Sequence, residues 1–202
     1  NGDGTNDLAK PRALYLNDGH GSFTLAPAGD YSVDLWSYTY AILAFDADGD
    51  GDTDLAVGNA GPQVDPCHWR PDPQCYWEPD VLYLNDGSGS FIRSPGGDFG
   101  GSGENDFDYT VALAAFDADG DGDLDLAEGL QGWCWEHDVT NPNCGGGGIR
   151  ILFNDGAGVF TSGHGVSGWT TDFAAADLDA DGDVDLAAAN IPDNGFNDAS
   201  FD

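Results

Sequence analysis

Aspartates recur at alternating positions in a short block of this sequence. Residues 45–59 read FDADGDGDTDLAVGN, so that aspartates stand at positions 1, 3, 5, 7 and 9 counted from Asp46, with Gly51 at position 6. Oxygen ligands at this spacing suit Ca²⁺, which accepts about six to eight of them in a flexible geometry. The glycine lets the chain turn back around the ion. Carboxylates packed so closely repel one another unless a cation lies between them. The block therefore predicts a calcium site.

The block returns twice, as FDADGDGDLDLAEGL in residues 116–130 and as ADLDADGDVDLAAAN in residues 176–190. Three occurrences argue against a merely solvated acidic face. Mg²⁺ is disfavoured because it retains its waters, and soft metals are disfavoured because no Cys or His joins the blocks. The position-7 aspartates are expected to contribute their backbone carbonyls. The predicted metal residues are Asp46, Asp48, Asp50, Asp52, Asp54, Asp117, Asp119, Asp121, Asp123, Asp125, Asp177, Asp179, Asp181, Asp183 and Asp185.

A partial copy stands at residues 1–8, which read NGDGTNDL. Asn1, Asp3 and Asp7 would occupy positions 3, 5 and 9, and position 1 is missing, so this site is incomplete or completed from elsewhere. An EF-hand is the competing interpretation of all these blocks, but it needs flanking helices and a glutamate at position 12. Only Glu128 meets the second requirement, and the flanking segments have the pattern of strands.

Elements that could position these loops follow from a second repeated block. It reads LYLNDGHGSF in residues 14–23, LYLNDGSGSF in residues 82–91 and ILFNDGAGVF in residues 151–160. Asn, Asp and Gly tolerate positive φ, so the Asn-Asp-Gly segment predicts a tight hairpin. Short apolar segments bounded by turn residues flank both kinds of block and predict strands. Each unit is thus strand A, Asp loop, strand B, a variable connection, strand C, hairpin and strand D.

Tandem units of this kind predict an all-β fold: four-stranded antiparallel blades of a β-propeller. Alanine-rich first strands suit the crowded inner strands of such an array; ordinary β-sandwich packing is the alternative. The chain would be one repeat region, 1–202, of about three to three and a half blades, open or part of a larger propeller or assembly. We expect strands B, C and D in 1–35, whole blades in 36–98 and 99–166, and strands A and B in 167–202.

The motifs DxDGDGDxDL, DxDADGDxDL and LYLNDGxGxF resemble the FG-GAP/VCBS repeat family, which includes the integrin α-subunit propeller. The resemblance covers nearly the whole chain. It implies propeller blades with one Ca²⁺ in each A–B loop, hence about three complete sites. Members of the family serve in adhesion, in lectin-like recognition and as non-catalytic parts of secreted enzymes. The resemblance implies a fold and a metal but no target.

Charge excludes several classes of partner. The chain holds 37 acidic and 5 basic residues, a net charge of −32. Nucleic-acid binding requires the opposite sign, and an anionic membrane surface would repel the chain. Membrane insertion is not expected, since no apolar run reaches about 18 residues. The alternative to cation sites is an acidic, salt-adapted surface, and the clustering of the aspartates favours cations.

Four cysteines form two local pairs, which predict the disulfides Cys67–Cys75 and Cys134–Cys144 and an oxidising, extracellular or cell-surface location. Free or metal-bound thiols are the alternative. Aromatic residues on these braced loops are candidates for recognition, for instance by stacking on sugar rings, although they could equally pack on one another. They are Trp69, Trp77, Trp133 and Trp135.

Catalysis has little support, because none of the four histidines belongs to a nucleophile or zinc motif. We therefore expect a non-enzymatic, extracellular calcium-binding repeat protein that acts in adhesion or as a scaffold or filament component, with structural Ca²⁺. A lectin-like carbohydrate-binding module and a non-catalytic domain of a secreted polysaccharide-active enzyme are the alternatives. The expected partners are a protein or carbohydrate at the cell surface or matrix, and further copies of the chain that complete its blades.

Overall fold

The computed structural model describes residues 4–10, 13–26, 38–60, 79–100, 109–131 and 147–191. Every regular element in these ranges is a β-strand, which confirms the all-β prediction. Among the same residues, no helix is long and apolar enough to cross a membrane.

The strands form four open, antiparallel sheets in which neighbours in the sequence are neighbours in space. The first sheet holds β1 (Leu8–Lys10), β2 (Ala13–Asn17) and β3 (Phe23–Leu25). The second holds β4 (Tyr38–Phe45), β5 (Asp54–Ala60), β6 (Val81–Asn85) and β7 (Phe91–Arg93). The third holds β8 (Tyr109–Phe116), β9 (Asp125–Gln131), β10 (Gly148–Asn154) and β11 (Phe160–Ser167). The fourth holds β12 (Trp169–Ala176) and β13 (Asp185–Ile191).

The second and third sheets thus follow the predicted A-B-C-D order. In each A–B hairpin the strand pairing shifts register near the start of the first strand. The shift lies between Thr39 and Ala41 in β4, between Thr110 and Ala112 in β8, and between Thr170 and Asp172 in β12. A bulge repeated at one position bends each first strand in the same way. The three units therefore share one backbone design.

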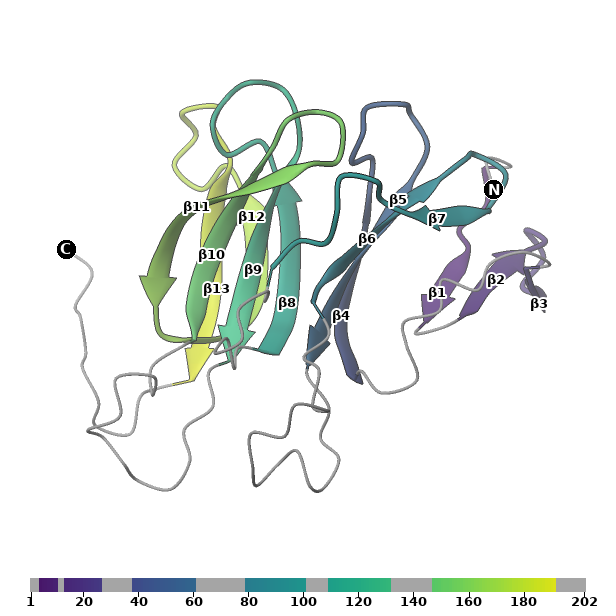
Figure 1. The fold of residues 1–202 in the computed structure, drawn as a ribbon, viewed down its shortest axis with the longest axis horizontal. Coiled ribbons are helices and arrows are strands. Elements are labelled where there is room, and N and C mark those ends of the chain that lie inside the picture. Colours follow the sequence, from purple (N-terminus) through teal and green to yellow (C-terminus); the bar gives the residue numbers. More distant parts are fainter. Residues whose placement is uncertain are drawn as a thin grey trace.

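Successive sheets lie side by side, and their first strands are adjacent: β4 contacts β8, and β8 contacts β12 (Figure 1). Glycines on the second strands permit this approach. A Cβ at Gly58 would stand 2.7 Å from Cγ2 of Thr110, and a Cβ at Gly129 would stand 3.0 Å from Cγ2 of Thr170. Both distances are too short for a larger residue to fit without movement, so the repeated glycine sets how closely the sheets approach.

The core lies between neighbouring sheets and not at one centre. One cluster of buried side chains joins the first and second sheets and comprises Leu14, Leu55, Val57, Val81 and Tyr83. A second joins the second and third sheets and comprises Phe45, Ala47, Ala56, Leu82, Phe99, Leu126 and Leu152. Burial of a residue in this array therefore depends on whether a neighbouring sheet covers it.

Candidate metal centres

The three Asp loops, residues 46–54, 117–125 and 177–185, each connect the first strand of a sheet to its second strand. All three lie at the same edge of the array (Figure 1). The last aspartate of each loop, Asp54, Asp125 or Asp185, is the first residue of the second strand. Because the two strands that flank each loop are paired, residues from the two ends of the loop lie close together.

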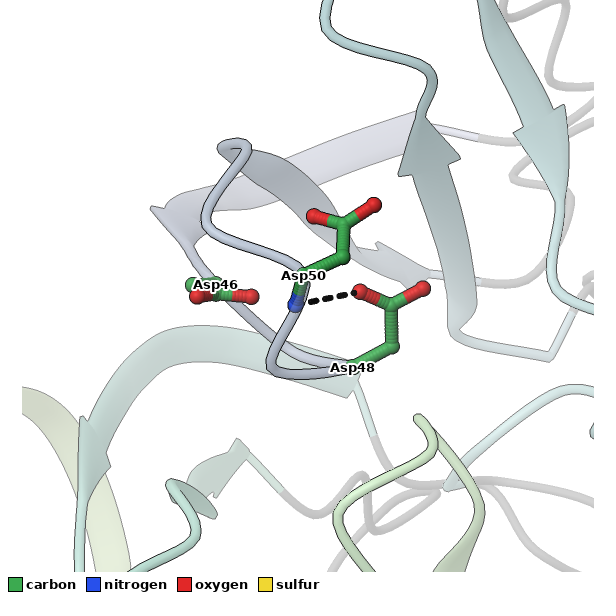
Figure 2. A group of neighbouring side chains, drawn as sticks. All are labelled: Asp46, Asp48 and Asp50. Carbon is green, nitrogen blue, oxygen red and sulfur yellow. Dashed lines mark hydrogen bonds between the residues drawn. The ribbon is translucent and has the colours of Figure 1, made fainter.

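In each loop three aspartates place carboxylate oxygens within 4.8 Å of one another. Two oxygens on opposite sides of a Ca²⁺ ion, each about 2.4 Å from it, would be separated by about 4.8 Å. Figure 2 shows the first group, in which the three side chains rise from one turn of the chain. The groups can therefore hold a metal ion; they are Asp46, Asp48 and Asp50; Asp117, Asp119 and Asp125; and Asp177, Asp179 and Asp185.

The other predicted metal residues lie outside these groups. They are Asp54, Asp121 and Asp181, and the position-7 residues Asp52, Asp123 and Asp183. Of the partial site, Asp7 is described, and Asn1 and Asp3 lie outside the described residues.

The aspartate at position 1 folds each loop back on itself. Asp46 accepts the backbone N–H of Gly49 on Oδ1 at 2.9 Å and that of Gly51 on Oδ2 at 3.0 Å. Asp117 accepts the corresponding amides of Gly120 and Gly122. Each carboxylate oxygen has two lone pairs and can accept an N–H while it binds a cation. These bonds therefore prepare the group for an ion and do not block it.

Chain reversal within the loops requires positive φ at position 4. Gly49 has φ +73° and Gly120 has φ +79° there, a region that glycine enters without steric cost. The third loop has Ala180 instead, with φ +65°, the one non-glycine residue with positive φ among the described residues. Its N–H still reaches Oδ1 of Asp177, at 2.7 Å. The third loop thus keeps the shared shape at the expense of strain in one alanine.

The aspartate at position 9 ties the loop to the neighbouring hairpin. Asp54 is fully buried; its Oδ2 accepts the N–H of Ala47 at 2.8 Å, and its Oδ1 accepts the N–H of Asn85 at 2.8 Å. Asp125 makes the same two bonds, to Ala118 and Asn154. In the partial copy, Asp7 accepts the N–H of Asn17.

Electrostatics in the loops favour a cation. Loss of hydration raises the pKa of Asp48, and the negative charge of Asp50 adds to the effect. The same causes, loss of hydration first, raise the pKa of Asp119. Burial also raises the pKa of Asp54, and hydrogen bonds from the amides of Asn85 and Ala47 oppose that rise. A divalent ion placed among these oxygens would offset both the repulsion and the lost hydration.

The Asn-Asp-Gly hairpins that begin at Asn85 and Asn154 pack against the first and second Asp loops, a role that the sequence did not reveal. In the Asn85 hairpin (residues 85–90), Oδ1 of Asn85 accepts the amides of Gly87 and Gly89, and Nδ2 donates to the carbonyl of Thr53. The carboxylate of Asp52 lies so close to Gly87 that a Cβ there would collide with it. The strict alternation of the two blocks was the signal that they belong together.

A buried polar cluster between the second and third sheets was also missed. Glu128, fully buried on β9, accepts a hydrogen bond from Nε of Arg150 on β10. Asp80, which precedes β6, accepts the N–H of Asn59 at 2.6 Å and the hydroxyl of Thr110 at 2.6 Å. Burial, and next the negative charge of Glu128, raise the pKa of Asp80 well above its usual range. The cluster joins the two sheets, and Glu128 has no part in the Asp loops.

Both predicted disulfides, Cys67–Cys75 and Cys134–Cys144, lie outside the described residues, as do Trp69, Trp77, Trp133 and Trp135. They stay predictions from the sequence.

Comparison with models of known protein families and with curated proteins gives no match. The resemblance to FG-GAP/VCBS repeats therefore stays a proposal, carried by the two repeated blocks and by the hairpins that they form.

Proposed function

We propose that this chain is a calcium-binding repeat protein of the FG-GAP/VCBS type, whose sheets are blades of a β-propeller or of a related open array. The observation that carries the proposal is the recurrence, in three loops, of three carboxylates whose oxygens lie within 4.8 Å of one another. One such cluster on an acidic protein would mean little. Three at equivalent places, each folded by the same hydrogen bonds, favour a common ligand.

In this proposal the ions are structural. In the second and third loops the ion would join position 1, after the first strand, to position 9, at the start of the second strand; in the first loop it would join positions 1, 3 and 5. Each ion would also offset the repulsion within a chain of net charge −32. Ca²⁺ is the ion of choice because the donors are all hard oxygens and because Ca²⁺ accepts a flexible arrangement of ligands, whereas Mg²⁺ demands a near-octahedral one. An extracellular location fits, because free calcium is abundant there.

The proposed role is adhesion or scaffolding. Apolar side chains at the end of the array support it: Leu178 is 64 % exposed and Val184 is 40 % exposed, whereas Ala47, at the loop position of Leu178, is buried in the second sheet. A further sheet that carries an Asn-Asp-Gly hairpin, in this protein or in a neighbouring copy, would cover them as the Asn154 hairpin covers Ala47. Light scattering and electron microscopy of concentrated protein with Ca²⁺ test this part, and protein that remains strictly monomeric counts against it.

The calcium proposal is tested by native mass spectrometry and thermal unfolding, with Ca²⁺ and after EGTA. We expect about three bound ions and a higher melting temperature with Ca²⁺, because an ion that binds only the folded chain stabilises it, by about 2.7 kcal/mol per site at about 100 times the Kd. Mg²⁺ at the same concentration should have less effect.

Asp48→Asn should remove one ion, whereas Asp98→Asn, which deletes the same charge at a residue paired with Arg93, should remove none. If EGTA changes neither mass nor stability, the loops are not structural calcium sites. The acidic, salt-adapted surface would then be the better account.

A further inference from the structure

One side chain contacts two different Asp loops. Nδ2 of Asn154, at the end of β10, donates to the carbonyl of Ala47 at 2.8 Å and to the carbonyl of Leu124 at 3.0 Å. Its Oδ1 accepts the amides of Gly156 and Gly158, each at 3.2 Å. Because the oxygen faces two N–H groups and the nitrogen faces two carbonyls, only this orientation of the amide satisfies all four partners. Asn154 is therefore fixed at a junction between the first and second Asp loops.

Both carbonyls belong to peptide units next to metal-group residues. Ala47 lies between Asp46 and Asp48 in the first group, and Leu124 directly precedes Asp125 in the second group. A change in the backbone at either place moves an acceptor of the same amide group. The two loops are thus linked by hydrogen bonds to a single buried side chain.

The surrounding contacts hold this junction in place. Asn154 is 6 % exposed, and its hairpin (residues 154–159) packs on the second sheet, where Oγ of Ser94 donates to the carbonyl of Gly158 at 3.4 Å. A Cβ at Gly158 would stand 3.0 Å from Cδ2 of Leu82. The hairpin of the third sheet is therefore anchored over the first Asp loop, and the bond to Ala47 is part of a packed interface.

The equivalent asparagine supplies an internal comparison. Asn85 accepts two glycine amides and donates to Thr53 of its own sheet, as Asn154 does to Leu124. The described bonds of Asn85 include none to a second loop. Loop coverage differs in the same way: Ala47 is 1 % exposed, whereas Ala118, at the same place in the second loop, is exposed.

We propose that Asn154 is a positioning residue that couples calcium binding at the first and second Asp loops, so that an ion in one loop raises the affinity of the other. The proposal rests on the calcium function proposed above. The physical basis is conformational entropy. Binding of the first ion orders the shared amide and its two acceptor peptides, so the second ion binds without losing that entropy again. The coupling must be reciprocal, because it is a free energy between two binding equilibria.

Calcium titration by calorimetry tests the coupling in an Asp179→Asn background, which disables the third group and leaves two sites. We expect two ions to bind with positive cooperativity. Disabling the first loop by Asp48→Asn in this background should weaken calcium binding at the second loop by about fivefold or more. With Asn154→Ala added, the affinity of the second loop should no longer depend on Asp48→Asn.

Asn85→Ala is the matched control, because it deletes the same hairpin bonds and the same own-sheet bond, and it should leave the coupling intact. Asn154→Asp is a second variant that retains the oxygen for the hairpin and loses the donor, in case the alanine variant does not fold; it should also abolish the coupling. Independent binding of two ions to the background protein, or coupling that survives in a folded Asn154 variant, would overturn the inference and leave the calcium function standing. No calcium binding at all would overturn both.

Discussion

Replacement of Ala180 by glycine should stabilise the protein, although it removes a methyl group. Ala180 holds φ +65° in the third Asp loop, where the first and second loops have glycine at φ +73° and +79°. A left-handed conformation costs a non-glycine residue about 1–2 kcal/mol. Relief of this strain is partly offset, because glycine gives the unfolded chain more conformational entropy, which lowers the free energy of unfolding by about 0.4–1 kcal/mol. Because Ala180 is exposed, no packing is lost, and the net gain should be about 0.5–1 kcal/mol.

The second loop offers the reverse experiment. A Cβ at Gly120 would meet no atom within 4 Å, so Gly120→Ala introduces backbone strain without a collision. It should therefore destabilise the protein by an amount similar to the gain from Ala180→Gly. For a chain of this size, about 1 kcal/mol corresponds to about 2–4 °C in melting temperature.

Thermal unfolding of the two variants and the parent, with EGTA and with Ca²⁺, measures both effects. We expect opposite signs in both conditions, because the strain belongs to the backbone of the loop and not to the ion. If Ala180→Gly lowers the melting temperature, or if Gly120→Ala leaves it unchanged, the assignment of strain to position 4 is refuted.

Three further predictions concern the supports of the loops and the contacts between sheets. The pKa of Asp80 is raised in the folded chain, so at pH values between the unfolded pKa, about 3.9, and the raised pKa the folded chain binds a proton that the unfolded chain has lost. The contribution of Asp80 to stability is therefore full at low pH and is lost as pH rises through this range. Asp80→Asn should therefore gain melting temperature relative to the parent as pH increases from about 5 to about 8, and a constant difference would contradict this. Asp54→Ala leaves two backbone N–H groups without their acceptor and should cost about 2–5 kcal/mol in urea unfolding with EGTA, more than Asp185→Ala in its half-buried setting; equal losses would contradict the account of Asp54 as a support. Leu126→Ala should cost about 2–5 kcal/mol, because Leu126 is fully buried between sheets, and Leu186→Ala, at the same position of a less covered sheet, should cost less in the same assay.

Much of the local structure could be predicted from the sequence. The apolar segments on either side of residues 46–53 and 117–124 predicted the strands, and Asn-Asp-Gly predicted the hairpins, because both depend on backbone preferences of a few adjacent residues. The spacing of the aspartates predicted three groups of carboxylates, since a loop of that length between two paired strands must bring its alternate residues together. The same reasoning extended to the third loop even though alanine replaces glycine there.

The relations between units could not be predicted in this way. Ala47 and Ala118 occupy the same place in nearly identical loops, yet the first is buried and the second is exposed. Among the described residues, the hairpin of the next sheet covers the first loop and no such hairpin covers the second. Glu128 stands at the position of an alanine or valine in the other copies. It bonds to Arg150 on the adjacent strand β10, and its charge acts on Asp80 of the neighbouring sheet, a contact that only the packing of the two sheets creates.

Asn154 shows most clearly the difference between contacts that the local sequence determines and contacts that the tertiary structure determines. The sequence determined that an asparagine would begin this hairpin and would bond to its glycines, because those partners lie within four residues of it. Only the tertiary structure decided that its amide nitrogen would also reach Ala47, 107 residues away. The first set of bonds follows from local backbone geometry; the last exists because two glycine-lined sheets pack closely enough to place one hairpin over its neighbour's loop.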